Sequence, residues 1–183
     1  IYTLGEWAKI TGKVFPNWEV TDTMPEADKV YYGLDFGWTD QTALIEVRQI
    51  DNNLFFKEHI YNSEYQTSEL ISYLKANVFT KKLAADHSAP RQIAELRQAG
   101  IRVKEAKIVP DYIMNGINLN RQNNILIESG SLNLIKEFKN YKWKKYKDWE
   151  VIPNTPIDKF NHLCDAARYA VSTYGKKRKF SIV

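Results

Sequence analysis

The stretch from Lys82 to Ala106, KLAADHSAPRQIAELRQAGIRVKEA, limits the folds open to this chain more than any other. Its apolar start, Lys82 to Ala85, predicts a strand that ends in Asp86. Pro90 to Ala99 predicts a helix that Gly100 ends, and Ile101 to Ala106 predicts a second strand. A strand, a crossover helix and a strand in this order pair in parallel, so part of the sheet is expected to be parallel.

Three strand-like runs come before this stretch, and they are Lys29 to Trp38, Ala43 to Ile50 and Leu54 to Tyr61. The turn Asp51 to Asn53 is short enough for a hairpin, so the runs should form an antiparallel meander. Apolar residues at helical spacing from Thr67 to Val78, behind the capping-type Thr67 or Ser68, predict a crossover helix. The expected fold class is therefore α/β, with a mixed sheet of three antiparallel strands and then parallel strands, and helices on both faces.

The composition is that of one globular domain, with 183 residues of which 44% are hydrophobic. We expect a lead-in segment at 1–27, the domain at 28–175 and a basic tail at 176–183. No apolar run approaches the roughly 20 residues that span a bilayer, and no signal peptide is evident, so no membrane partner is expected. The single cysteine, Cys164, excludes an internal disulfide framework and favours a reducing compartment.

The positive charge is clumped although the net charge is only +4. One clump lies between Lys136 and Lys147, and the other is the run Lys176 to Lys179. Several lysines that face one polyanion together release its counterions, which favours nucleic acid as a partner. A solvated face and a frayed tail are the alternative explanations.

Two aspartates lie in or directly after predicted strands. In YYGLDFGWTD, strand alternation puts Asp35 on the same face as Gly33 and Gly37, and glycine within a strand indicates that a ligand or another chain approaches the backbone closely. A chance Asp at a sheet edge is the alternative. Asp86 lies at the carboxyl end of its strand, where ligands of α/β sheets bind, but it could instead cap the helix that starts near Pro90.

A third aspartate lies in the helix predicted from Lys159 to Tyr174, where Asn161, His162, Asp165 and Tyr169 lie near one face. An acid in an Ala-rich helix that packs on a sheet is costly to bury unpaired, so Asp165 needs a partner. If this helix crosses the ends of the other two strands, Asp35, Asp86 and Asp165 converge. Two Mg²⁺ or Mn²⁺ ions would neutralise such an all-oxygen cluster, which favours phosphate chemistry.

The pieces GLDFGWTDQTAL, AADHSAPRQIAELRQAGI and NHLCDAARYAV together resemble the C-terminal nuclease domain of the large terminase subunit of tailed bacteriophages, which has a ribonuclease H-like fold. The match runs from about Gly5 to Gly175. The resemblance implies an endonuclease that cuts concatemeric double-stranded viral DNA at the start and end of genome packaging, in the cytoplasm of the infected bacterial host. It implies that Asp35, Asp86 and Asp165 are its catalytic, metal-binding acids, and that the cofactors are two divalent cations.

The resemblance also implies partners and further residues near the site. In the full-length protein the partners would be an N-terminal packaging ATPase domain, the viral portal and the small terminase subunit; this chain has no GxxxxGK[ST] phosphate loop, so we expect no ATPase activity in it. His162 is expected near the metals and Asp40 beside the site. Relatives often carry an acid where this chain has Asn161, which leaves Asp158 as a weak candidate for a fourth ligand.

Two basic features extend the predicted site. Lys107 follows the strand that ends at Ala106 and could hold a phosphate, although it could equally be a surface lysine. Lysines interleaved with aromatic residues in NYKWKKYKDWEVIP predict a β-hairpin that touches DNA, unless it is an ordinary solvated hairpin with two rings in the core. The DNA-binding candidates in this segment are Lys142, Trp143, Lys144, Lys145 and Lys147.

Two other functions remain open. Asp86 with Glu105, Ala106 and Lys107 mimics the D…ExK pattern of restriction-type nucleases, which would make Glu105 and Lys107 catalytic and leave Asp35 and Asp165 structural. The chain could also be a module that only binds DNA or a packaging partner, with its acids serving as caps and members of ion pairs. Metal-dependent cleavage separates that module from both nucleases.

Overall fold

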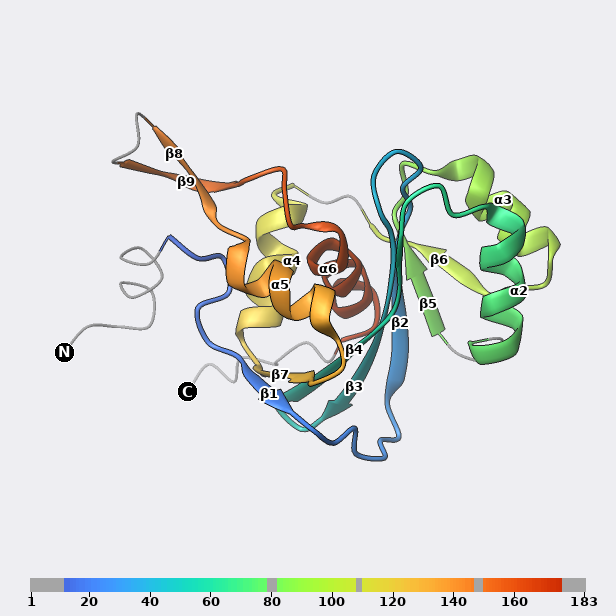
Figure 1. Cartoon of the computed structure of the whole chain (residues 1–183), viewed down its shortest axis with the longest axis horizontal. Coiled ribbons are helices and arrows are strands. Elements are labelled where there is room, and N and C mark those ends of the chain that lie inside the picture. Colours follow the sequence, from blue (N-terminus) through green and yellow to red (C-terminus); the bar gives the residue numbers. More distant parts are fainter. Residues whose placement is uncertain (1–11, 79–81, 108–109, 147–149, 176–183) are drawn as a thin grey trace.

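The computed structural model describes residues 12–78, 82–107, 110–146 and 150–175. In this part of the chain seven strands form one mixed sheet in the order β1-β7-β4-β3-β2-β5-β6 (Figure 1). The strands are β1 (Glu19–Thr21), β2 (Val30–Asp35), β3 (Thr42–Ile50), β4 (Asn53–Asn62), β5 (Lys82–Ala85), β6 (Val103–Glu105) and β7 (Asn124–Glu128). The helices are α2 (Thr67–Asn77), α3 (Pro90–Gln98), α4 (Tyr112–Arg121), α5 (Leu132–Asn140) and α6 (His162–Tyr174).

The strand pairing confirms the predicted mixed sheet. β2, β3 and β4 pair antiparallel in succession, as the short turn at Asp51 predicted. β5 pairs parallel with both β2 and β6, as the strand, helix, strand order requires. Gly33 of β2 lies opposite Ile45 of β3 on one side and Ala84 of β5 on the other, so β2 pairs antiparallel with one neighbour and parallel with the other.

The sequence did not predict the far side of the sheet. β7 pairs parallel with β4, and the short strand β1 pairs parallel with β7 at the edge. In the segment expected as a lead-in, Val14 and Phe15 are buried in the main core. The ring of Phe15 packs there against those of Phe138 and Tyr141, which come much later in the chain, so local periodicity could not reveal its burial.

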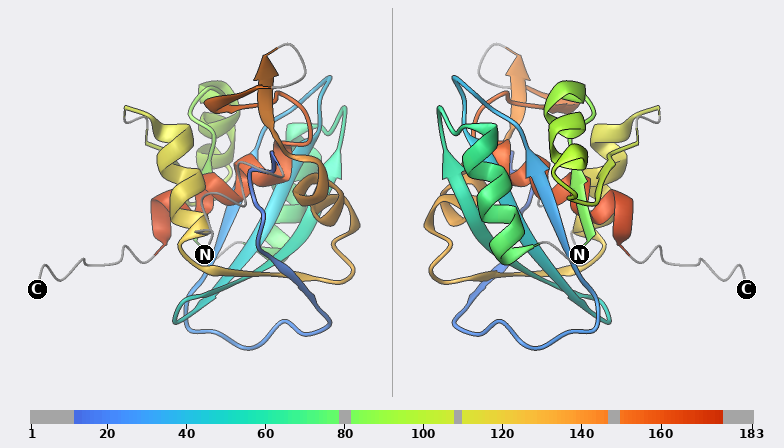
Figure 2. Two further views of the ribbon diagram at one scale, coloured as in Figure 1. Left: turned by 90° about the vertical axis from the view of Figure 1, so that its left-hand side faces the viewer. Right: turned by 90° about the vertical axis from the view of Figure 1, so that its right-hand side faces the viewer.

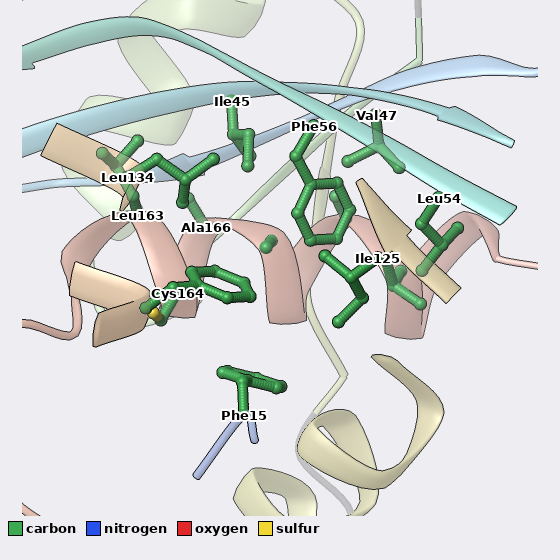
Figure 3. Packing of buried hydrophobic residues seen from close by; sticks show 14 of the residues in the cluster. Phe15, Ile45, Val47, Leu54, Phe56, Ile125, Leu134, Leu163, Cys164 and Ala166 are labelled. Carbon is green, nitrogen blue, oxygen red and sulfur yellow. The ribbon is translucent and has the colours of Figure 1, made fainter. Parts of the chain in front are cut away.

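Helices cover both faces of the sheet, as predicted (Figures 1 and 2). α4, α5 and α6 lie on one face over the main core, and α2 and α3 lie on the other over a second apolar cluster. Figure 3 shows the main core, where Phe56 of β4 and Ile125 of β7 pack against α6. Phe15 stacks on Phe138 of α5, with ring centroids 4.7 Å apart.

Two helix starts differ from the predictions. α6 begins at His162 rather than Lys159, because Phe160 has a left-handed backbone (φ 57°) that a helix cannot include. The residue that caps α2 is Gln66 rather than Thr67 or Ser68, and Glu69 accepts a hydrogen bond from the Gln66 backbone N–H at 3.0 Å. In the described part of the chain, no helix is both long enough and apolar enough to cross a membrane.

The predicted hairpin is present as β8 (Trp143–Tyr146) and β9 (Glu150–Pro156), which pair antiparallel apart from the main sheet. It extends away from the helical layer of α4, α5 and α6 (Figure 1). Its expected turn at Lys147 and Asp148 lies outside the described residues, as do the basic run 176–179 and the first 11 residues.

Candidate active site

Gly33 allows α6 to lie directly on β2. A Cβ atom at this position would come within 1.8 Å of the Ala166 carbonyl oxygen of α6, so only glycine permits this approach. The sequence pattern indicated such an approach, and the partner is a helix of the same chain rather than a ligand. Gly37 serves the turn after the strand, since a Cβ there would lie 2.6 Å from the Asp40 carbonyl oxygen. Both glycines flank Asp35 for reasons of packing.

Asp35 ends β2 beneath the start of α6. Its side chain lies 3.1 Å from the ring of His162, measured from Oδ2 to Nδ1, and the residue is 9% exposed. Burial raises the pKa of Asp35 to about 7; the His162 hydrogen bond opposes this shift, and the negative charges of Asp165 and Asp86 add to it. The same hydrogen bond raises the pKa of His162 against the effect of burial.

Asp165 has the partner that its position in the helix requires, and that partner is Arg168. Both Nε and Nη2 of Arg168 donate to Oδ1 of Asp165, at 3.1 Å and 3.0 Å. Burial raises the pKa of Asp165, and the Arg168 charge opposes that shift. Arg168 is itself buried, with its guanidinium 4.6 Å from the ring centroid of Tyr169 and 5.1 Å from that of Tyr112. The sequence did not identify Arg168, although its i+3 spacing from Asp165 was a usable signal.

Asp86 follows β5, and its backbone N–H donates to the Leu34 carbonyl oxygen at 3.1 Å, which places it beside the end of β2. Its carboxylate accepts hydrogen bonds from the backbone N–H and the hydroxyl of Ser88, and its Oδ1 lies 3.2 Å from Nδ1 of His87. The helix α3 has Ala89 at its cap position, without a side-chain cap. Asp86 is therefore not the N-cap that the sequence left open.

The three aspartates gather at one end of the sheet, close enough to interact through their charges. The negative charge of Asp86 raises the pKa of both Asp35 and Asp165. Even so, the described residues contain no group of three or more His, Cys, Asp and Glu side chains already arranged around a metal position. The His162 contact falls on Oδ2 of Asp35 and the Arg168 contacts fall on Oδ1 of Asp165, so the second oxygen of each can bind a cation without breaking the pair. Oxygen donors and mutual repulsion fit a hard divalent cation.

The remaining near-site candidates differ in position. Asp40 is exposed in the turn after β2, and its charge contributes to the raised pKa of His162. The backbone N–H of Ala106 donates to the Ala85 carbonyl oxygen at 2.8 Å, so Lys107 follows directly at the end of the sheet that carries Asp86. Asp158 is exposed ahead of α6, where its Oδ1 accepts a 3.3 Å hydrogen bond from Asn161.

A buried acid that the sequence analysis missed holds the start of α6. Oε2 of Glu137, on α5, accepts hydrogen bonds from the backbone N–H groups of Leu163 and Cys164 at 2.8 Å and 3.1 Å. Its Oε1 accepts a hydrogen bond from the Tyr61 hydroxyl at 3.0 Å. These bonds satisfy two free donors of the helix that carries His162 and Asp165. No helix had been predicted at 132–140, so nothing singled Glu137 out.

The hairpin candidates divide into two groups. Lys142, Lys144 and Lys145 are exposed, as a DNA-binding surface requires. Trp143 is only 8% exposed and belongs to the main core together with Tyr141, so its prediction as a DNA contact is wrong. These two rings anchor the hairpin in the main core. Two rings in the core were part of the alternative, a solvated hairpin, that the sequence analysis left open. Lys147 lies outside the described residues.

Glu105, the key residue of the D…ExK alternative, takes a different partner. Its Oε1 lies 3.0 Å from Nη2 of Arg97, and its side chain is 47% exposed. Glu105 therefore pairs with α3, whereas Asp35, Asp86 and Asp165 interact with one another.

The sheet has three antiparallel strands followed by parallel ones, and acids lie at the ends of β2 and β5 and at the start of α6. This arrangement defines a ribonuclease H-like domain. The family described as "Terminase RNAseH like domain" matches residues 35–173. The chain belongs to this family, which confirms the resemblance to the nuclease domain of phage large terminases.

Solved structures agree with this assignment. The nuclease domain of the large terminase (g2p) of bacteriophage SPP1, solved with bound Mn, is 25% identical with a TM-score of 0.78, over 87% of this chain and 97% of that one. The large terminase of the thermophilic bacteriophage D6E is 26% identical with a TM-score of 0.66, over 82% of this chain and 41% of that one. The P22 large terminase nuclease domain, 16% identical with a TM-score of 0.65 over 87% and 90%, shares the fold. No curated protein matched the chain.

Proposed function

We propose that this chain is a metal-dependent endonuclease that cleaves concatemeric double-stranded viral DNA when genome packaging starts and ends. The observation that carries the proposal is the meeting of Asp35, Asp86 and Asp165 at one end of the sheet, where the charge of Asp86 raises the pKa of both Asp35 and Asp165. Family membership and the likeness to the SPP1 nuclease domain support it. The work would take place in the cytoplasm of the infected bacterial host.

Two divalent cations, Mg²⁺ or Mn²⁺, are the proposed cofactors, with Asp35, Asp86 and Asp165 as their ligands. When bound, such a pair supplies the charge that activates the attacking water and stabilises the leaving oxygen. The chain's own residues prepare for this: Glu137 fixes the start of α6, Arg168 opposes the rise in the pKa of Asp165 that burial causes, and His162 orients Asp35. Because the SPP1 domain was solved with bound Mn, a divalent-cation site in this chain has support from a relative as well as from its own carboxylates.

The DNA duplex is proposed to lie across this end of the sheet, with Lys142, Lys144 and Lys145 of the hairpin on its backbone. Lys107, which follows β6 at the same end of the sheet, is proposed to contact a phosphate. The chain spans 41% of the D6E large terminase, so an N-terminal packaging ATPase domain, the portal and the small terminase subunit are proposed partners of a longer protein.

The decisive experiment is cleavage of supercoiled plasmid with Mn²⁺, Mg²⁺ or EDTA. We expect Asp35→Asn, Asp86→Asn and Asp165→Asn each to lower the cleavage rate strongly. Loss of a residue that only supports a metal ligand typically lowers activity by about 10–100-fold, and loss of a ligand itself should lower it further. Glu105→Gln is the matched control and should cut at close to the normal rate, because Glu105 pairs with Arg97. Each variant keeps the shape of its side chain, and circular dichroism checks its fold.

The same experiment separates the alternatives. Loss of cutting in Glu105→Gln with activity retained in Asp35→Asn would support the restriction-type site, and no cutting with any metal would favour a binding module. The number of ions needs its own measurement, which is calorimetric titration of Mn²⁺. Two Mn²⁺ ions bound per wild-type chain, with fewer bound to Asp165→Asn, would support the two-ion proposal. One ion bound per wild-type chain would contradict it.

A further inference from the structure

A pocket of about 660 Å³ lies between β6, α4 and α6. Arg168 lines this pocket and also binds Asp165, so the pocket begins one side chain away from the proposed catalytic acids. Its volume falls within the roughly 300–1,000 Å³ of small-molecule sites. We propose that it binds one deoxynucleoside monophosphate unit, either as a free nucleotide or as part of a DNA strand next to the cleavage site. Binding of a DNA strand there rests on the proposed nuclease function.

The charge of the pocket favours an anion. Lys104, Lys107 and Arg168 line it, and Glu105 is the acid among the lining residues. Glu105 is already neutralised by Arg97, with 3.0 Å between Oε1 and Nη2. Both lysines are exposed and can therefore reach a phosphate without being desolvated in its absence.

The remaining walls suit a nucleobase and a sugar. Asn115 and Asn118 of α4 and Gln122 directly after it bring amide groups, and amides pair with base edges through both a donor and an acceptor. Tyr112 adds an aromatic ring beside the Arg168 guanidinium, and such surfaces stack bases of any sequence. The Thr173 hydroxyl oxygen is buried and has no hydrogen-bond partner among the described residues, so a bound ligand could satisfy it.

The link to the catalytic acids is direct. Arg168 fits into this wall because Gly116 leaves room, since a Cβ at Gly116 would lie 2.2 Å from Cγ of Arg168. The ring of Tyr112 also meets the ring of His87, the neighbour of Asp86, at 6.2 Å between centroids. A nucleotide in the pocket would therefore touch Arg168, which binds Asp165, and Tyr112, which packs on the neighbour of Asp86, and would place a strand next to these acids.

The test is calorimetric titration of deoxyadenosine 5′-monophosphate into the whole chain in EDTA. We expect the mononucleotide to bind. Deoxyadenosine alone and inorganic phosphate alone should each bind at least tenfold more weakly than the mononucleotide. Lys104→Glu should weaken mononucleotide binding at least tenfold, and Asn118→Trp should do so by filling the pocket without a change of charge. Arg102→Glu is the matched control: Arg102 is exposed just before β6 and is not among the described residues that line the pocket, so affinity should stay the same.

Competition with a labelled 12-nucleotide single strand then identifies the source. Displacement of the strand by the mononucleotide supports a strand unit as the natural occupant, and a strand that stays bound supports a free nucleotide. No binding of the mononucleotide, or binding that survives both Lys104→Glu and Asn118→Trp, overturns the proposal. The titration contains no divalent cation and measures no cleavage, so its failure and the failure of the proposed nuclease activity are separate results.

Discussion

At the scale of single residues, the chain neutralises each buried acid with a specific partner. Asp35 uses His162, Asp165 uses Arg168, and Glu137 uses the backbone N–H groups at the start of α6. The sequence showed that Asp165 required a partner because an unpaired charge is costly to bury. For Asp35, only the folded chain identified the partner, because His162 lies 127 residues away in the sequence.

A fourth buried acid, Glu46, gives a prediction about pH. Its carboxylate accepts hydrogen bonds from Nε of Arg48 at 2.6 Å and from the Tyr32 hydroxyl at 3.1 Å, and its Oε2 lies 2.9 Å from Nε2 of His59. Burial alone would raise the pKa of Glu46, but the hydrogen bonds and charges of His59 and Arg48 lower it to about 2. A lowered pKa contributes stability that is present above the ordinary value of 4.5 and is lost as the pH falls toward 2.

We therefore expect Glu46→Gln to lower the free energy of unfolding at pH 7 by about 2 kcal/mol, measured by urea denaturation. The difference between variant and wild type should shrink as the pH falls from 4.5 to 2. Glu95→Gln is the control, because Glu95 forms an exposed i,i+4 pair with Arg91 and should change stability by less than about 0.5 kcal/mol. A Glu46→Gln effect that is independent of pH would contradict the assignment.

At the scale of elements, the close approach of α6 to β2 decides where the proposed catalytic acids meet. Gly33 permits that approach, and Glu137 sets the end at which α6 starts. Glycine in YYGLDFG was readable as a sign of close approach, but its partner was not, since α6 follows more than a hundred residues later.

Gly33→Ala tests this contact. Its methyl group would overlap the Ala166 carbonyl oxygen, so α6 must move away from β2, and we expect a loss of at least about 2 kcal/mol of stability. Plasmid cleavage should fall as well, because the shift separates His162 from Asp35. Urea denaturation and cleavage assays check the two effects.

Gly130→Ala is the matched control for that variant. Its new methyl group would meet the flexible side chain of Glu128 at 2.9 Å, which can move aside, so a loss under about 1 kcal/mol is expected. If Gly33→Ala proves as mild as Gly130→Ala, the contact between α6 and β2 is not as tight as described.

At the scale of the whole molecule, the hairpin of β8 and β9 extends from the helical layer, and Tyr141 and Trp143 anchor it in the core (Figure 1). Its exposed lysines are proposed to bind the DNA backbone. Since each phosphate contact releases counterions, charge reversal of Lys144 should weaken DNA binding and lower the slope of affinity against salt by about 1. Fluorescence anisotropy at several salt concentrations measures both quantities.

The control for the hairpin is Lys75→Glu on α2, which lies on the opposite face of the sheet (Figure 1). Lys75 is exposed and undergoes the same change of charge. Its substitution should weaken DNA binding only slightly, through the long-range electrostatic attraction that salt screens. Equal losses for Lys144→Glu and Lys75→Glu would show that net charge, and not the hairpin, attracts the DNA.

The sequence by itself determined the elements whose signals are local. Periodicity and turn residues predicted β2 to β4, α2, β5, α3 and β6 in the correct order and pairing; flanking glycines pointed to Asp35, and the end of a strand pointed to Asp86. The resemblance, carried by three short motifs, supplied the family. These features depend on neighbours within a few residues or on chain order, which the sequence states directly.

Tertiary structure alone decided the features that join distant segments. β7 and α5 complete the sheet and the core, Glu137 caps α6, Trp143 is buried rather than free for DNA, and a pocket opens beside Arg168. Each depends on side chains that meet across many residues of chain, where hydrophobic burial and charge pairing select one arrangement from many that local propensity allows. For that reason the acids were found from the sequence, while the groups that hold them in place were found only in the fold.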